Sequence, residues 1–287
     1  MNASTPKSAL VVGCGDIGLR ISARLHAQGV AVTGWVRTAT SAGAVQAAGH
    51  TLLQADLDAR LDTLPAFDAV YYCAPPPTVG ATDPRLRALL TCLPVPSRGL
   101  LYISTSGVYG NCGGRWIDEA EPLKASSERG LRRLDAEFAL RAWAARSGAR
   151  TVTLRVPGIY GPGRMPVARL QRGDPVVREA NSPFTNRIHA DDLAEAALLV
   201  HARGEINAAY NISDGQPTTM TDYILRCARL LGVAEPPSIS YAEAQQRFSP
   251  MLRSFLEESK RLKTDRLRGL GFVPRYANLA AGLPSCV

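Results

Sequence analysis

The chain has 287 residues, 46% hydrophobic and 20% charged, which suits one large α/β domain or a large domain with a small lobe. Its net charge of +8 comes from arginines spread singly along the sequence, without stacking-aromatic motifs, and this favours an anionic ligand over nucleic acid. The start at 1–7 is polar, and no apolar run is long enough to span a membrane, so we expect a cytoplasmic protein with no membrane partner. The six cysteines lack zinc-binding spacing, so we expect no metal.

The first elements predicted are a strand, a glycine-rich turn, a helix and a second strand. Residues 9–12 are apolar, and from Ile17 to Leu25 apolar residues recur four apart before Gly29 ends the pattern. A β-branched stretch at 30–36 follows at once. These segments predict one βαβ unit.

Four further strand-like runs continue the alternation, each separated from the next by a helix-compatible segment. These runs are 51–53, 69–73, 99–103 and 151–154. The alternation predicts fold class α/β with a Rossmann-type doubly wound parallel sheet. The longest predicted helix covers 127–146 and begins near a serine-rich cap.

After residue 157 prolines and glycines break the chain into shorter pieces. We therefore predict a dinucleotide-binding domain at 1–157 and a mixed region at 158–287, which contributes the last sheet strands and a small C-terminal substrate-binding lobe. Helices are expected near Asp191, with Asp191 or the next aspartate as its cap, and at 220–231 before Gly232.

The glycine-rich turn reads Gly13-Cys-Gly15-Asp-Ile-Gly18, directly after a strand and at the start of a helix. Gly13 permits the tight turn, Gly15 lets the backbone approach a diphosphate, and Gly18 lets the helix pack against the strand. Free amides at the helix start face the phosphates, so Asp16 and Ile17 belong to the same predicted site. The pattern predicts a site for the diphosphate of NADP or NAD.

The second strand ends on Arg37, where an NAD-specific protein would present an acid to the ribose hydroxyls. A carboxylate would repel a 2′-phosphate, whereas Arg37 pairs with one, and hydroxyls follow at 38–41. NADP is therefore the expected cofactor and NAD the alternative, with a solvated surface arginine as the other interpretation of Arg37.

Several motifs in this order resemble the extended short-chain dehydrogenase/reductase superfamily, also called the NAD-dependent epimerase/dehydratase family. The motifs are found at 55–57, 104–110, 154–163, 187–193 and 210–214. The resemblance covers nearly the whole chain. The glycine loop has the spacing of atypical members, since Val12 replaces the first glycine of the extended form.

For the adenosine half of the cofactor the resemblance implies two contacts. Asp56 and Leu57 would border the adenine, although Asp56 could serve only as a turn residue. Ala74 and Pro75 would line the ribose. All four follow strands, at the edge of the sheet where ligands of open α/β sheets bind.

For the nicotinamide half the resemblance implies a second group of residues. Thr105 occupies the position that hydrogen-bonds the reacting hydroxyl or carbonyl group. Pro157, Gly158 and Ile159 would flank the carboxamide. Tyr109 is a candidate proton donor, or a pocket wall that buries its ring.

The acid/base pair of the family, Tyr-x-x-x-Lys on the long helix, is missing here. Those positions hold Arg129 and Arg133, and no tyrosine occurs between Tyr109 and Tyr160. Arginine keeps its proton and cannot act as a general base. The two arginines share a helix face and could clamp a carboxylate or phosphate, or form a solvated basic face. Tyr109, Thr105 or a substrate group is left to supply the proton.

The leading hypothesis is an NAD(P)-dependent oxidoreductase or epimerase-like enzyme, acting by hydride transfer on a small carbonyl or hydroxyl compound that is anionic or sugar-derived. The runner-up is a catalytically silent NADP-binding sensor or scaffold. The resemblance implies a homodimer formed through paired long helices.

Overall fold

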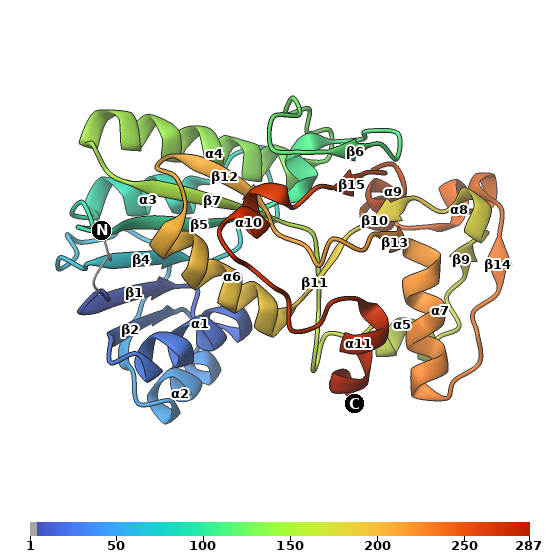
Figure 1. Ribbon diagram of the computed structural model, residues 1–287, viewed down its shortest axis with the longest axis horizontal. Coiled ribbons are helices and arrows are strands. Elements are labelled where there is room, and N and C mark those ends of the chain that lie inside the picture. Colours follow the sequence, from blue (N-terminus) through green and yellow to red (C-terminus); the bar gives the residue numbers. More distant parts are fainter. Residues whose placement is uncertain (1–4) are drawn as a thin grey trace.

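The computed structural model describes residues 5–287, so the first four residues of the polar amino-terminal stretch lie outside it. A seven-stranded parallel sheet forms its centre, in the order β12-β7-β5-β4-β1-β2-β3 (Figure 1). Its strands are β1 Ser8–Val12, β2 Ala31–Val36, β3 Thr51–Gln54, β4 Ala69–Tyr72, β5 Gly99–Thr105, β7 Thr151–Val156 and β12 Ala208–Asn211. The predicted Rossmann-type doubly wound sheet is confirmed.

The strand order reverses between β1 and β4. The chain runs outward through β2 and β3, then returns to β4 and continues on the other side. Connections on the two sides of this point leave the sheet in opposite directions, which opens a crevice at the carboxyl ends of the strands. The glycine loop follows β1, so the fold places that loop at the crevice.

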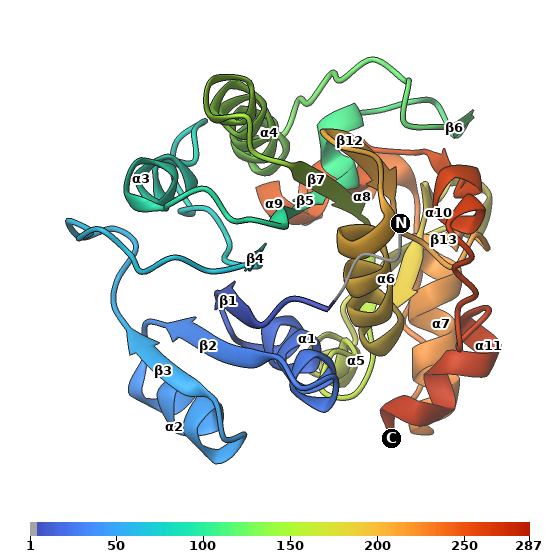
Figure 2. The same cartoon turned by 60° about the vertical axis from the view of Figure 1, so that its left-hand side comes forward.

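Helices cover both faces of the sheet, as Figure 2 shows. One face carries α1 Asp16–Ala27, α2 Ala39–Ala47 and α6 Ala190–Arg203, and the other carries α3 Pro84–Cys92 and α4 Glu128–Ser147. Strand β1 alternates between them: Val11 packs in the first core and Leu10 in the second, both fully buried. Because both sides of β1 are buried, its sequence is continuously apolar.

Two predicted helix-end signals, Ser127 and Gly232, are confirmed. Ser127 caps α4 by accepting the amide of Gly130 at 3.3 Å, and Gly148 ends that helix in the left-handed conformation. Helix α7, Met220–Leu231, ends in the same way at Gly232.

Helix α6 begins differently from the prediction. Its cap is His189, whose Nδ1 accepts the amide of Asp191 at 3.1 Å. The side chain of Asp192 instead accepts the amides of Arg275 and Tyr276, at 2.8 and 3.0 Å. The prediction of an aspartate cap was wrong: His189 caps the helix, and Asp192 binds the carboxyl-terminal segment.

The remaining elements are short and form the second part of the molecule, on the right in Figure 1. They include β6 Trp116–Ile117, β8 Gly158–Tyr160, α5 Val167–Gln171, β9 Val176–Val177, β10 Phe184–Thr185, β11 Arg187–His189, β13 Thr218–Thr219, β14 Ser238–Ile239, α8 Tyr241–Arg247, α9 Pro250–Leu256, β15 Arg261–Leu262 and α11 Leu279–Gly282, with 3₁₀ turns at 106–109, 179–181 and 283–286. Helix α10, Asp265–Gly269, instead packs against the core of the large sheet through Leu267. Strand β15 pairs with β6, whereas α6 and β12 return to the large sheet. Residues after 157 therefore build both parts.

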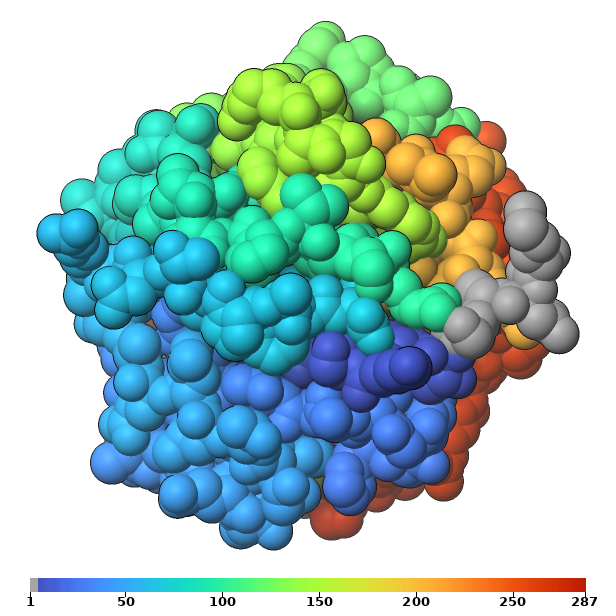
Figure 3. All heavy atoms as spheres, turned by 90° about the vertical axis from the view of Figure 1, so that its left-hand side faces the viewer, coloured from blue at the N-terminus to red at the C-terminus, as the bar shows by residue number. Residues whose placement is uncertain are grey.

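The end of the molecule shown in Figure 3 is formed mainly by segments from the first half of the chain, with later segments along one edge. No helix among residues 5–287 combines the length and the apolar character that crossing a bilayer requires. The cytoplasmic location and the homodimer stay predictions.

Candidate functional site

Two glycines of the glycine loop are closely packed and a third is open. Gly13 has φ +76°, and a Cβ there would lie 2.5 Å from the backbone nitrogen of Ala74. A Cβ on Gly18 would lie 2.8 Å from the Gly13 carbonyl oxygen and 3.1 Å from Val11 Cγ1. Gly15, the residue before α1, has open space within 4 Å of where its Cβ would be. The loop is closely packed where it meets the protein and open where a ligand would approach.

A first cavity of about 250 Å³ extends from this loop along the carboxyl ends of β2, β3 and β4. Its lining residues are Gly13, Gly15, Trp35, Val36, Arg37, Thr38, Ser41, Ala55, Asp56, Leu57, Ala74, Pro75 and Arg85. Seven of the predicted cofactor-binding residues are thus brought together, among them Arg37 and Asp56. The Asp56 carboxylate accepts the amide of Asp58 at 3.0 Å, so this residue also forms the turn that was the alternative.

Arg85, on α3, lines the same cavity and was missed in the sequence. Its guanidinium donates to both carboxylate oxygens of Asp58, at 2.7 and 2.5 Å, and to the Pro75 carbonyl at 3.0 Å. The Arg85 hydrogen bond lowers the pKa of the Asp58 carboxyl. No local pattern marks this arginine, because only the packing of α3 beside β4 brings it to the cavity.

Asp16, Ile17 and Gly18 were predicted for the cofactor site but do not line the first cavity. Ile17 is buried in the core beneath α1, and Gly18 packs against β1. The Asp16 carboxylate forms ion pairs with Arg20, at 2.8 Å, and with Arg164. Despite partial burial, these two arginines keep the pKa of Asp16 below its usual value.

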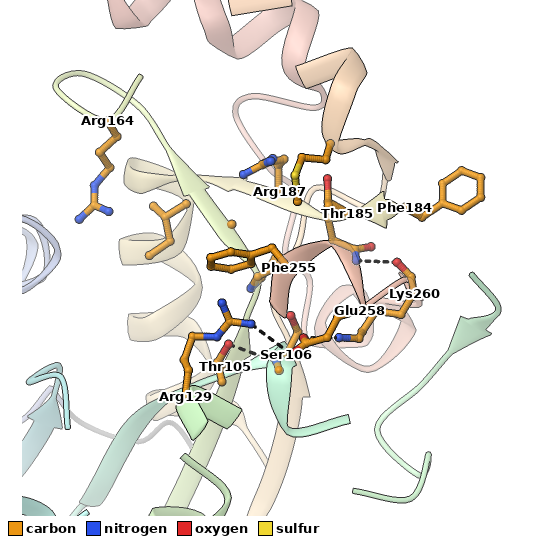
Figure 4. A pocket seen from close by; sticks show the side chains of 16 residues that line it. Thr105, Ser106, Arg129, Arg164, Phe184, Thr185, Arg187, Phe255, Glu258 and Lys260 are labelled. Atoms are coloured by element: carbon orange, nitrogen blue, oxygen red, sulfur yellow. Dashed lines mark hydrogen bonds and ion pairs between the residues drawn. The ribbon is translucent and has the colours of Figure 1, made fainter. Parts of the chain in front are cut away.

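A second cavity of about 330 Å³ lies between the sheet and the second part of the molecule (Figure 4). Its lining residues are Thr105, Ser106, Gly107, Arg129, Pro157, Gly158, Ile159, Arg164, Phe184, Thr185, Asn186, Arg187, Met220, Phe255, Glu258 and Lys260. Five predicted residues meet here: Thr105, Arg129 and the run 157–159. Four cationic side chains and one carboxylate line the cavity, so it favours an anionic ligand.

Thr105 is the last residue of β5, at the floor of this cavity. Its Oγ1 accepts the amide of Gly107 at 3.2 Å and caps the following 3₁₀ turn. A hydroxyl also carries a proton to donate. The cap fixes the position of the oxygen, which leaves the proton for a group in the cavity.

Arg129 enters the cavity from the first turn of α4. Its Nη2 donates to Glu258 Oε1 at 3.2 Å, and its guanidinium lies 3.9 Å from the ring centroid of Phe255. Nε and Nη1 are buried and have no hydrogen-bond partner among residues 5–287. Burial lowers the pKa of Arg129 and the carboxylate opposes that shift, so the group stays cationic. Donors without partners next to a cavity suit an anionic ligand.

Arg133 does not join Arg129 in a clamp. Its Nη1 donates to the carbonyls of Ile103 and Ala74, at 2.9 and 3.4 Å, and to Tyr102 Oη at 3.1 Å. The sequence predicted that Arg129 and Arg133 act together, either as a clamp or as a solvated basic face, and this prediction was wrong. Arg133 lies one turn after Arg129 on α4, and its guanidinium is hydrogen-bonded to residues at the ends of β4 and β5.

Tyr109 also lies away from the second cavity. Its hydroxyl donates to Asn211 Oδ1 at 2.7 Å and accepts from Arg155 Nη1 at 3.0 Å. Arg155 in turn forms a buried ion pair with Glu137 at 2.9 Å. Burial raises the pKa of Tyr109 to about 12. The structure therefore places Tyr109 in a buried polar network, and its expected role as proton donor is corrected.

Glu258 and Lys260 are two of the lining residues of the second cavity that the sequence analysis did not predict. The Lys260 ammonium lies 2.9 Å from Glu258 Oε2, and both side chains are less than a tenth exposed. Ser127 donates to Glu258 Oε1 at 2.9 Å. The backbone of 258–260 is held by Asn186, whose amide donates to the Lys260 carbonyl at 3.0 Å. Because Ser127 and Asn186 are far from Glu258 and Lys260 in the sequence, no local sequence motif predicts these contacts.

Comparison with known proteins identifies the family. The sequence model of the NAD dependent epimerase/dehydratase family matches residues 9–213, which is more than two thirds of the chain. The chain belongs to this family. The match ends before α7, so the family's sequence pattern covers the sheet, the glycine loop and Thr105, but not Glu258 or Lys260.

Two curated relatives are trifunctional proteins from Arabidopsis thaliana, each described as a UDP-glucose 4,6-dehydratase, a UDP-4-keto-6-deoxy-D-glucose 3,5-epimerase and a UDP-4-keto-L-rhamnose reductase. Each is 24% identical to this chain over 189 residues. The match covers 62% of this chain but only 27% of each relative, so the chain spans about a quarter of their length.

Solved structures extend the likeness over nearly the whole chain. A conserved protein of unknown function from Silicibacter pomeroyi is 30% identical, with a TM-score of 0.82 over 97% of both chains. A UDP-glucose 4-epimerase from Thermus thermophilus, in complex with NAD, is 22% identical, with a TM-score of 0.76 over 97% of both chains. A dTDP-glucose 4,6-dehydratase from Streptomyces venezuelae is 20% identical, with a TM-score of 0.77 over 96% of this chain and 94% of that one.

Proposed function

We propose that this chain is an NAD(P)-dependent oxidoreductase or epimerase-like enzyme that moves hydride to or from an anionic carbonyl or hydroxyl compound. The observation that carries the proposal is the pair of cavities at the carboxyl edge of one sheet. One is bounded by the glycine loop and Arg37, the other by Thr105 and a cluster of cations. A dinucleotide across both would bring its reactive ring to Thr105.

The residues of the first cavity fit a dinucleotide with a 2′-phosphate. Arg37 is exposed there, and Thr38 and Ser41 add hydroxyls linked to each other at 3.0 Å. Arg85 supplies a second guanidinium, already balanced by Asp58. These donors support NADP as the preferred cofactor. When bound, its nicotinamide ring exchanges hydride with a substrate carbon.

The proton that accompanies hydride transfer needs a donor in the second cavity. The arginines there keep their protons, and Tyr109 lies elsewhere. A lysine ammonium can release a proton, and the Lys260 ammonium lines this cavity. We assign the acid/base role to Lys260, with Thr105 orienting the substrate oxygen.

A third cavity, of about 570 Å³, supports a phosphorylated substrate. Phe255 lines both this cavity and the second one. Arg169, Arg172 and Arg247 line the third cavity, and Nε of Arg169 is buried with no partner among residues 5–287. Guanidinium groups bind phosphates by paired hydrogen bonds. Together with the relatives named for UDP-glucose chemistry, this makes nucleotide-linked sugars the favoured substrate class.

The second candidate is a catalytically silent NADP-binding sensor. It is favoured by the arginines at both positions of the missing Tyr-x-x-x-Lys pair, one of which is hydrogen-bonded to strand ends. Such a protein would keep the first cavity and need no proton donor.

The experiment that decides between the two is hydride transfer from NADPH deuterated at C4, after calorimetric titration with NADPH and NADH. Keto sugars linked to UDP or dTDP are the first panel, followed by other anionic ketones. Transfer of deuterium to product supports the enzyme. Tight binding without transfer to any compound supports the sensor, and no binding of either dinucleotide rejects both.

A further inference from the structure

Arg164 joins the start of α1, next to the glycine loop, to the second part of the molecule. Arg164 lies in the loop after β8, where its amide donates to the Gly161 carbonyl at 3.0 Å. Its Nε donates to the carboxylate of Asp16, which lies 148 residues earlier in the chain, at the first turn of α1. The Arg164 side chain is about one third exposed.

This contact links residues that border the two cavities. Gly15 lines the first cavity, Arg164 lines the second, and Asp16 directly follows Gly15. A dinucleotide with its adenosine in one cavity and its other nucleoside in the other must carry its diphosphate past the start of α1. The Arg164 guanidinium is therefore held beside the path of the diphosphate.

Asp16 makes this position electrostatically unusual. A carboxylate in the first turn stabilises α1, but it also repels a diphosphate at the same helix end. Arg20 pairs with Asp16 at 2.8 Å and with Asp191 at 2.6 Å, and it lines neither cavity. Asp16 thus keeps one cationic partner when Arg164 moves away.

We propose that Arg164 is a further cofactor-binding residue, which leaves Asp16 and pairs with the diphosphate when the dinucleotide binds. The proposal rests on the proposed function, because it assigns a residue to the same cofactor. Only side-chain rotation is required, since Asp16 and the diphosphate would lie at the same helix end. Arg164 then covers the diphosphate from the substrate side of the crevice.

Calorimetric binding of three ligands to Arg164→Gln tests the proposal without relying on turnover. NADPH and ADP-ribose contain a diphosphate, whereas AMP does not. Loss of a charge-assisted pair should weaken NADPH and ADP-ribose about 10- to 100-fold and leave AMP within about threefold. Arg226→Gln, which removes a surface arginine paired with Asp222, is the matched control and should bind all three like the wild type.

Asp16→Asn provides the opposite change. Removing the carboxylate frees Arg164 and ends the repulsion, so NADPH should bind more tightly than to the wild type, and the gain should shrink when Arg164→Gln is also present. NADPH binding to Arg164→Gln within threefold of wild type, or an equal loss for AMP, would overturn the proposal. A wild-type protein that binds no dinucleotide would instead reject the proposed function, and this inference with it.

Discussion

Arg129 donates to the carboxylate of Glu258 at 3.2 Å, across 129 residues of sequence. Through this contact α4 of the sheet domain is tied to the segment after α9, and the same carboxylate holds the Lys260 ammonium. One buried anion therefore holds both cations at the second cavity.

Replacing this anion should destabilise the protein. Glu258→Gln leaves two largely buried cations without a counter-charge, and we expect the free energy of unfolding in urea to fall by about 3 kcal/mol. Glu128→Gln is the control: its carboxylate is exposed, and its buried partner Arg132 keeps a hydrogen bond to the Gly80 carbonyl, which predicts a change below about 1 kcal/mol. Equal losses in the free energy of unfolding for the two variants would show that the Glu258 carboxylate is no more important for stability than an exposed one.

The acid/base role of Lys260 predicts a sharp difference between activity and stability. Lys260→Arg keeps the charge beside Glu258 but cannot release a proton, so hydride transfer from NADPH should slow about 100-fold or more. NADPH affinity and the melting temperature should stay close to wild type. Stopped-flow single turnovers measure the transfer step, and an unchanged rate would remove Lys260 from the mechanism.

Cofactor preference should depend on Arg37. Arg37→Asp places a carboxylate beside the 2′-phosphate, and we expect the affinity for NADPH to fall about 100-fold while that for NADH is retained or improves. Arg60→Asp makes the same charge change at an exposed residue outside the first cavity, and it should shift both affinities little. Calorimetry that finds equal wild-type affinities for NADPH and NADH would contradict the NADP assignment.

Two glycines of the same loop should respond in opposite ways to alanine. Gly13→Ala meets the Ala74 backbone and a positive φ, so it should lower the free energy of unfolding by at least about 2 kcal/mol. Gly15→Ala has room for its methyl group and should unfold like the wild type, but with at least tenfold weaker NADPH binding, because the methyl group occupies the approach to the diphosphate. Denaturant titration and calorimetry on both variants provide the comparison.

Asp214 should make stability fall with rising pH. Burial raises its pKa to about 7, and its Oδ2 has no hydrogen-bond partner among residues 5–287. The folded state therefore binds this proton more tightly than the unfolded state. The contribution of Asp214 to the free energy of unfolding is greatest below about pH 4 and is lost as the pH rises to about 7. The loss is expected to reach up to about 4 kcal/mol.

Asp214→Asn should remove that component. Burial lowers the pKa of His201 to about 4, which makes stability rise between pH 4 and 6.5, so the two groups oppose each other in the wild type. The difference between wild type and Asp214→Asn isolates the aspartate. Urea unfolding at pH 5 and pH 8 should show this difference growing with pH, and a constant difference would contradict the shift.

Much of the sheet domain could be predicted from the sequence because its signals are local. The order of apolar runs predicted the doubly wound sheet, and Ser127 marked the start of α4 through a hydrogen bond to the amide three residues on. The glycine loop is local in the same sense, since Gly13 and Gly18 are constrained by the turn they form and by the neighbouring strands.

Only the tertiary structure decided which charged groups meet at the crevice. Two arginines four residues apart on α4 have the same sequence signal, yet Arg129 reaches the second cavity and Arg133 binds the ends of strands. Arg85, Arg164 and Lys260 reach their cavities from separate elements. Side-chain charges act through space at a few ångströms, so their partners are set by how distant segments pack, which no local pattern of residues encodes.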